Sequence, residues 1–334
     1  MTNSMELVCG IDAGNRYLKA VTTNKEIVCP SMVGQGRDDL LRMNPDANES
    51  AMILKYGDGT YFVGDLADRE SENVSLALDE SKVEHTNTIV LILAAVVMLA
   101  PPDVRWMDVN AVVGMPIDHF RNKETRQKLV DILTANVHNV YVGGKPRLVR
   151  FKSVMPFPEG AAELFTVLPA HPEYKCKDYT VGNIHVGAWR TSYVVLEGME
   201  YRDRLSGTLP LGMHQALHMV KTNRMLHEIE RVAVKNEELF RSLEESRDLK
   251  AKQIVDNLKA KWPHVDDFDA IYITGMGAGT VQKYLPQSRV MPKPKNIDGR
   301  ILANAPHEQM ATARGLYDVG VIRYGLPTIH IPTG

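Results

Sequence analysis

Two segments of the chain, far apart in the sequence, share a strand, glycine turn and strand pattern that constrains the fold more than any other feature. The first reads GIDAGNRYLKAV over residues 10–21, and the second reads GNIHVGAWRTSYVV over residues 182–195. Each places a polar side chain two residues before a glycine: Asp12 in the first segment and His185 in the second. Helical segments follow the strands in both halves. This order predicts a duplicated α/β unit rather than one doubly wound sheet.

Length and charge limit the classes of protein that the chain can belong to. Its 334 residues are enough for two domains, at about 150 residues per domain. The hydrophobic share of 44% and the charged share of 24% are typical of soluble globular proteins. The formal net charge is -2, so there is no basic excess of the kind that marks direct nucleic-acid binders. We therefore expect no direct contact with nucleic acid.

Cysteines and apolar segments indicate a cytoplasmic protein. Cys9, Cys29 and Cys176 are widely spaced, which argues against a disulfide framework or a zinc site. The N-terminal residues show no secretory signal pattern. The apolar stretch at residues 89–100 falls short of the roughly 20 residues that a membrane span needs. We expect a buried helix there and no membrane span.

A third glycine-rich turn lies in the second half of the chain. Residues 270–274 form a predicted buried strand that runs into GMGAG and then into a predicted helix. Small residues at such a turn let a flat ligand or a phosphate approach the backbone, and the helix N-terminus offers free N–H groups. A tight structural turn needs glycine as well, so this pattern alone leaves both interpretations open.

Taken in order, five segments resemble the actin, DnaK-chaperone and sugar-kinase superfamily, and within it the bacterial actin-like ParM/StbA segregation proteins. GIDAGNRYLKA resembles the first phosphate loop, and GNIHVGAWRTS resembles the second. MPFPEGAAEL resembles the connecting helix with its catalytic acid, ITGMGAG the adenosine loop, and QMATARGLYDVG the closing helix. The resemblance spans nearly the whole chain. It implies an actin-like (ribonuclease H-like) α/β fold, with two related domains around a nucleotide cleft.

The resemblance also implies domain boundaries and a ligand. Domain I would comprise residues 1–165 plus 306–334, and domain II would comprise residues 166–305. ATP or GTP, with Mg²⁺, would lie between two opposed hairpins whose backbone N–H groups contact the phosphates. A carboxylate would hold Mg²⁺ through water.

Carried over residue by residue, the resemblance assigns most of this site. Asp12 would hold Mg²⁺ through water, and Lys19 would reach toward the phosphates unless it is a solvent-facing strand lysine. Glu159 would orient the attacking water, although a carboxylate before a helix can also be a plain cap. The backbone that contacts phosphates and adenosine would come from Gly14, Asn15, Arg16, Gly187, Ala188, Gly275, Met276, Gly277 and Ala278. Arg314, in the closing helix, is expected to pair structurally.

The second phosphate loop departs from the pattern of the family. ParM-like and DnaK-like chains usually read D-x-G-x-x-T-x-D there, whereas this chain has His185 and Ser192 at the two acidic positions. Imidazole is a poor ligand for Mg²⁺, which prefers oxygen. Three interpretations of His185 remain open. In the first, His185 or the nearby Arg190 offsets phosphate charge in an altered ATPase. In the second, His185 marks a site that binds nucleotide with little or no hydrolysis. In the third, it has no nucleotide role.

Functions from several classes fit these features. The first is a ParM-like filament protein that polymerises with ATP and segregates plasmid or other DNA through a DNA-binding adaptor. The second is a small-molecule kinase, against which the missing acids argue. The third is a non-hydrolysing scaffold whose assembly does not depend on nucleotide. A chaperone is disfavoured because only 17 residues follow Tyr317.

Overall fold

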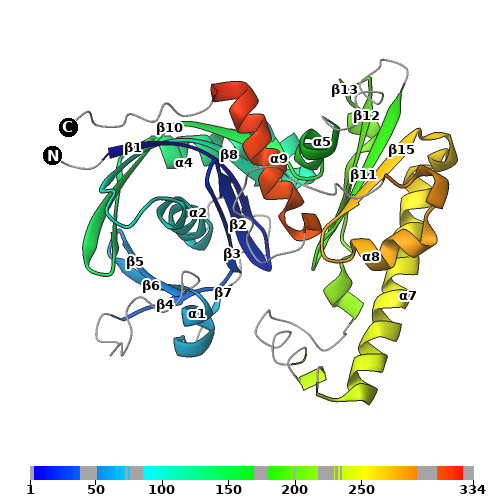
Figure 1. The fold of residues 1–334 in the computed structure, drawn as a ribbon, viewed down its shortest axis with the longest axis horizontal. Coiled ribbons are helices and arrows are strands. Elements are labelled where there is room, and N and C mark those ends of the chain that lie inside the picture. The colour runs from blue at the N-terminus through cyan, green and yellow to red at the C-terminus, as the bar shows by residue number, and fades with distance from the viewer. Residues whose placement is uncertain are drawn as a thin grey trace.

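Two β-sheets form the framework of the protein, with helices on both faces of each sheet (Figure 1). The computed structural model describes residues 4–37, 51–71, 74–75, 86–168, 179–198, 200–216, 229, 232–233, 235–291 and 307–325. Cys176 and residues 326–334 lie outside this part. The expected domain boundaries after residues 165 and 305 stay a prediction.

The larger sheet has ten strands in the order β3-β2-β1-β8-β10-β9-β5-β6-β4-β7. Strand β1 pairs in parallel with β8, and β8 with β10, while the other pairings are antiparallel. The strands are β1 (Ser4–Ala13), β2 (Tyr17–Thr22), β3 (Lys25–Pro30), β4 (Val33–Gln35), β5 (Ala51–Tyr56), β6 (Gly59–Gly64), β7 (Val74–Ser75), β8 (Trp106–Met115), β9 (His138–Val142) and β10 (Lys145–Pro158).

Strand β1 is buried on both faces, which explains its nearly continuous apolar sequence. Leu7, Cys9 and Ile11 face a core that contains helix α2 (Thr86–Leu99), whereas Val8 faces helix α9 (His307–Tyr324). The expected buried helix at residues 89–100 is therefore confirmed. No helix in the described ranges is both long enough and apolar enough to cross a membrane.

The smaller sheet has the order β13-β12-β11-β15, with β14 beside β12. Its strands are β11 (Thr180–Val186), β12 (Thr191–Glu197), β13 (Glu200–Tyr201), β14 (Gly207–Leu209) and β15 (Ala270–Thr274). On one face, Ile184 and Val195 pack with helix α7 (Glu237–Lys261) and Trp262. On the other face, Val181 and Val194 pack with helix α5 (Ala161–Val167). This sheet is also enclosed by helices.

The expected duplication is visible in the register of two hairpins. Strands β1 and β2 are antiparallel and β1 lies parallel to β8, just as β11 and β12 are antiparallel and β11 lies parallel to β15. Asp12 is the penultimate residue of β1 and lies opposite Lys19. His185 is the penultimate residue of β11 and lies opposite Ser192. Helices α5 and α9 contact each other between the two sheets (Figure 1).

The remaining helices surround these layers. Asn122 caps α4 (Lys123–Thr134) by accepting a hydrogen bond from the Thr125 N–H, which separates α4 from α3 (Ile117–Arg121). The others are α1 (Asp65–Glu70), α8 (Ala278–Val281) and the 3₁₀ turns η3 (Asp203–Leu205), η4 (Met213–Ala216), η5 (Val265–Asp267), η6 (Gln282–Tyr284) and η7 (Gln287–Arg289).

Candidate functional site

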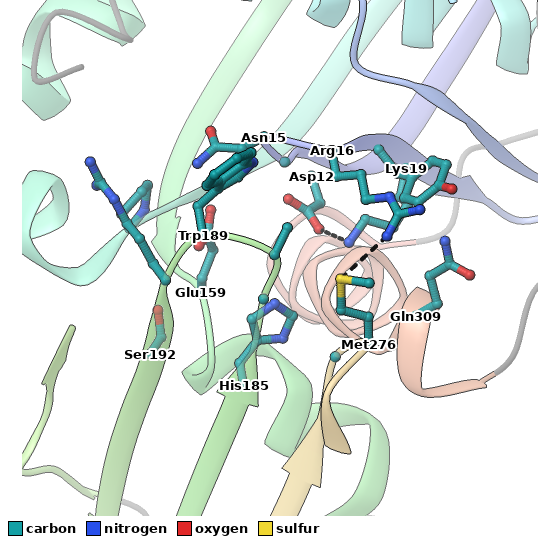
Figure 2. Close-up of a pocket in the computed structure, with 17 residues that line it drawn as sticks. Asp12, Asn15, Arg16, Lys19, Glu159, His185, Trp189, Ser192, Met276 and Gln309 are labelled. Atoms are coloured by element: carbon teal, nitrogen blue, oxygen red, sulfur yellow. Dashed lines mark hydrogen bonds and ion pairs between the residues drawn. The ribbon is translucent and has the colours of Figure 1, made fainter. Parts of the chain in front are cut away.

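A cleft opens between the turns of the two hairpins, where β1–β2 faces β11–β12 (Figure 2). The turn that follows β15 forms a third side of it. Eleven of the thirteen residues expected from the sequence line this cleft: Asp12, Gly14, Asn15, Arg16, Lys19, Glu159, His185, Gly187, Ala188, Gly275 and Met276. Segments separated by up to 264 residues of sequence therefore meet at one place.

The first hairpin contributes a buried ion pair. Lys19 Nζ lies 2.5 Å from Asp12 Oδ2, and both side chains are less than a tenth exposed. The two residues are cross-strand neighbours, so the hairpin register itself brings them together. Lys19 is therefore not a solvent-facing strand lysine. It lines the cleft with its charge balanced by Asp12.

The second hairpin carries a different ion pair at the equivalent place. His185 Nδ1 lies 2.6 Å from Oε1 of Glu163, a residue of α5 that is completely buried. Thr312 Oγ1 donates to Oε1 at 2.6 Å, and Asn183 Nδ2 donates to Oε2 at 2.7 Å. Thr274 Oγ1 also donates to Oε2. The histidine at the cleft thus has a carboxylate behind it.

These contacts shift both pKa values in the direction that favours charge. Burial raises the pKa of Glu163, but the charge and hydrogen bond of His185 and the two threonine hydroxyls outweigh it, so that its pKa falls to about 2. Burial lowers the pKa of His185, but the Glu163 carboxylate raises it by more than burial lowers it, so the net shift is upward. The geometry favours an imidazolium paired with a carboxylate.

Glu159 lies on the cleft wall, directly after β10 and before α5. Its backbone N–H donates to the carbonyl of Met115 at 2.8 Å, which fixes the chain next to the end of β8. The N-cap of α5 is Gly160, so Glu159 is not the capping residue of this helix. The alternative of a plain helix cap is therefore wrong, and the carboxyl is placed at the cleft.

The two glycines of the turn after β15, Gly275 and Gly277, are required for different reasons. Gly275 has φ +83 and a Cβ there would lie 2.4 Å from the Val186 carbonyl oxygen, so only glycine fits. A Cβ on Gly277 would lie 2.3 Å from the side chain of Met213. Gly277 is the N-cap of α8 and Ala278 is its buried first residue. These last two are not among the residues that line the cleft, so the tight-turn interpretation holds for them.

Arg16 reaches from the first hairpin across to the opposite wall. Its Nη1 lies 2.6 Å from His214 Nε2 on η4 and 3.7 Å from Met276 Sδ. Figure 2 shows the contact between Arg16 and Met276 at the same end of the cleft as Lys19. Arg16 thus connects the two walls of the cleft, which the sequence did not indicate.

Several lining residues are absent from the sequence assignment: Tyr17, Pro116, Trp189, Ser192 and Gln309. Arg190, which the sequence suggested as an aid to His185, also lines the cleft. Trp189 Nε1 is buried and has no hydrogen-bond partner in the described part of the chain. A buried donor without an acceptor fits a ligand that carries acceptor oxygens.

Arg314 does not line the cleft. Its guanidinium forms a bidentate, buried pair with Glu26, as expected for a structural residue.

The arrangement of two hairpin turns facing each other across a cleft, with a helix beneath each sheet, defines the actin-like fold. Residues 10–161 match the sequence model of the N-terminal domain of actin-like proteins. The fold is therefore actin-like, as the motifs predicted. No curated protein sequence matches the chain.

Solved structures share the fold over nearly the full length of both chains. A ParM from a 15-stranded filament of Clostridium botulinum aligns with a TM-score of 0.74 and 22% identity, covering 96% of this chain and 99% of the other. An archaeal actin homologue in complex with ADP has a TM-score of 0.70 and 17% identity, with coverages of 95% and 99%. Bacillus thuringiensis ParM with AMPPNP has a TM-score of 0.67 and 14% identity, with coverages of 95% and 99%.

Proposed function

We propose that this protein is a ParM-like filament protein that binds ATP between its two hairpins and polymerises in response. The observation that carries the proposal is the convergence of both hairpin turns and the β15 turn on one cleft. Backbone N–H groups from two sides suit phosphate oxygens, and the β15 turn suits a flat base. ADP and AMPPNP appear in the structures of two proteins with this fold, which supports a nucleotide as the ligand.

The residues of the cleft also fit Mg²⁺ held through the nucleotide. Asp12 supplies oxygen ligands, the type that Mg²⁺ prefers, and nucleotide phosphates commonly complete such a site. Among the described residues no group of three or more His, Cys, Asp or Glu side chains is arranged to hold a metal by itself. Asp12 would therefore hold the ion through water, and the ion would offset phosphate charge when bound.

Hydrolysis in this proposal depends on Glu159. Its carboxylate orients a water whose oxygen bonds to the γ-phosphorus while the bond from that phosphorus to the β–γ bridging oxygen breaks. ADP leaves with the electron pair, and one proton of the water passes through Glu159 to solvent. Lys19 and His185 lie where they can offset the charge of the phosphates.

The same comparison supports a proposal for the cellular role. Among proteins with this fold is a ParM filament from Clostridium botulinum, which supports self-assembly of this chain. We propose that its filaments segregate plasmid or other DNA in the cytoplasm. The net charge of -2 gives the chain no basic excess for binding DNA directly, so a DNA-binding adaptor would join the filament to its cargo.

A second candidate, a non-hydrolysing scaffold, is favoured by one observation. Neither His185 nor its cross-strand partner Ser192 supplies a carboxylate to metal or water. Light scattering and phosphate release, measured together after ATP is added, separate the two candidates. ATP-dependent scattering with turnover supports the filament ATPase, whereas scattering that is indifferent to nucleotide, with no turnover, supports the scaffold.

A further inference from the structure

Glu163 is a fully buried carboxylate at the back of the cleft that the proposed reaction does not use. It lies on α5, four residues after Glu159, and has no exposed surface. A buried charge is costly unless it is paired and hydrogen-bonded, so its surroundings must offset that cost. The offset comes from four donors on three elements: Asn183 and His185 on β11, Thr274 on β15 and Thr312 on α9.

The number of donors determines which ring nitrogen of His185 carries a proton. An ionised carboxylate only accepts hydrogen bonds and has about four lone-pair sites. Two donors reach Oε1 and two reach Oε2 of Glu163, so His185 Nδ1 must carry a proton in order to donate. This leaves Nε2 as the ring nitrogen that is not held by Glu163. The ring belongs to the lining of the cleft and is 14% exposed.

We infer that Glu163 is a positioning residue that holds His185 as an imidazolium, whose Nε2–H donates a hydrogen bond to the γ-phosphate of the bound nucleotide. The inference rests on the proposed function. It explains how the second hairpin can contact phosphate without the two acids that related chains have at the positions of His185 and Ser192. The negative charge of Glu163 lies behind the histidine instead of facing the phosphates. His185 then favours a triphosphate, since a diphosphate lacks the group that it contacts.

The charged groups around His185 support this assignment. Glu163 faces the ring from α5, Glu159 lies before the same helix, and Lys19 faces it from β2. The two carboxylates favour the imidazolium, whereas Lys19 and burial oppose it. The carboxylates outweigh the opposing effects, so the pKa of His185 is raised. Lys19 is itself paired with Asp12 at 2.5 Å, which reduces its repulsion of the ring.

Nitrogen NMR of the nucleotide-free protein tests the charge state without any variant at position 163. The full chain is labelled with ¹⁵N-histidine, and the ring of His185 is assigned through its contacts with Thr274 and Thr312. We expect both ring nitrogens of His185 to remain protonated at a pH at which exposed histidines of the same protein are neutral. A ring of His185 that becomes neutral together with the exposed histidines would overturn the inference.

Calorimetry then tests the consequence for nucleotide. Glu163→Gln keeps the size of the side chain and removes its charge, so the carboxylate that stabilises the His185 imidazolium is lost. We expect the ratio of AMPPNP affinity to ADP affinity to fall about tenfold, since a charge-assisted hydrogen bond is lost. Glu163→Asp, which keeps the charge, restores part of the ratio. Glu245→Gln, at an exposed position of α7, leaves it unchanged.

The outcomes separate this inference from the proposed function. A wild-type protein that binds both nucleotides, together with a Glu163→Gln variant that keeps the wild-type ratio, would overturn only the role of Glu163. A folded wild-type protein that binds neither AMPPNP nor ADP would overturn the proposed function and the inference with it. If Glu163→Gln fails to fold, the NMR measurement on the wild-type protein still decides the charge state on which the inference depends.

Discussion

Asp12 and His185 occupy the same place in two related hairpins, each as the penultimate residue of the first strand. Asp12 is paired across the hairpin with Lys19, so its acid and base lie on neighbouring strands of one sheet. His185 is paired with Glu163, which comes from a helix behind the sheet. The duplicated units therefore place opposite charges at equivalent positions.

Glu159→Gln should reduce the rate of ATP hydrolysis by about 10²-fold or more, because an amide cannot take a proton from the attacking water. Nucleotide affinity should change little, since the side chain is assigned to water and not to the nucleotide. Phosphate-release kinetics and calorimetry with AMPPNP check the two parts. The matched control is Glu245→Gln on α7; equal rates in both variants would exclude Glu159 from the reaction.

His185→Asp alone, which restores the acid usual in the family, should destabilise the protein. The new carboxylate would lie beside the buried Glu163, and breaking a buried ion pair in this way costs about 3–5 kcal/mol. A second change, Glu163→Gln, should recover most of the loss because its amide can donate to the aspartate. Urea unfolding of the single and double variants gives the coupling free energy. Additive effects of the two changes would contradict the pairing.

The pair should also make stability depend on pH. The pKa of Glu163 is lowered from 4.5 to about 2 on folding, so its contribution is present above pH 4.5 and is lost as the pH falls toward 2. The pKa of His185 is raised above 6.5, so its contribution is complete below pH 6.5 and is lost as the pH rises through the folded value. Together they stabilise most between about pH 4.5 and 6.5.

Urea unfolding at pH 5.5, 7.5 and 9 measures this dependence. The free energy of unfolding of the wild-type protein should fall over this range by more than that of the double variant Glu163→Gln/His185→Gln, which lacks both titrating groups. Parallel pH profiles of the two proteins would show that the pair contributes no pH dependence.

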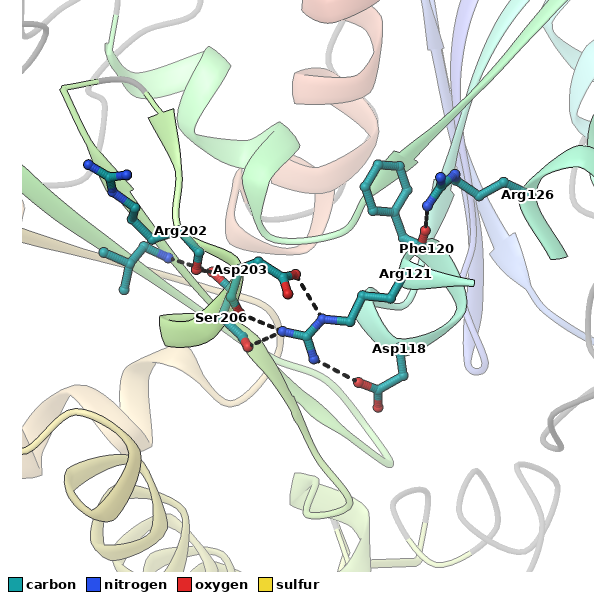
Figure 3. Close-up of polar contacts among 8 residues, drawn as sticks. Asp118, Phe120, Arg121, Arg126, Arg202, Asp203 and Ser206 are labelled. Carbon is teal, nitrogen blue, oxygen red and sulfur yellow. Dashed lines mark hydrogen bonds and ion pairs between the residues drawn. The ribbon is translucent and has the colours of Figure 1, made fainter. Parts of the chain in front are cut away.

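A separate contact joins the two sheets away from the hairpins (Figure 3). Arg121 Nε on α3 lies 2.8 Å from Asp203 Oδ1 on η3, and its Nη2 donates to the carbonyl of Ser206 at 2.8 Å. Helix α3 begins directly after Pro116, which lines the cleft. The contact therefore holds the walls of the cleft together.

Arg121→Ala should loosen this closed arrangement. We expect a larger radius of gyration in solution scattering and a several-fold lower affinity for AMPPNP, because part of the binding free energy would be used to close the cleft. Arg241→Ala, which removes an exposed pair within α7, is the control. A radius and affinity equal to those of the control would show that the contact does not hold the cleft closed.

The sequence was sufficient for the parts of the site that are local. Asp12, Glu159 and His185 each lie in a short segment whose glycine or proline neighbours set the turn, and the cleft contains all three. Glu163 could not be found this way. It resembles any acid in the first turn of a helix, where the helix dipole favours it, and its threonine partners lie 111 and 149 residues further along the chain.

Other features of the cleft also depend on contacts between distant segments. The contact of Arg16 with His214 depends on how two sheets pack, which no local pattern encodes. Gly277 and Ala278 share a glycine-rich segment with Gly275, but they form the start of α8 and are not among the residues that line the cleft.

Electron microscopy of the purified protein shows whether filament assembly depends on nucleotide. Samples with ATP, AMPPNP, ADP and no nucleotide are compared at one protein concentration. A nucleotide-dependent actin-like protein forms filaments with ATP and AMPPNP and few or none without nucleotide. Monomers under all four conditions at high concentration, or the same filaments in all four, would contradict the account.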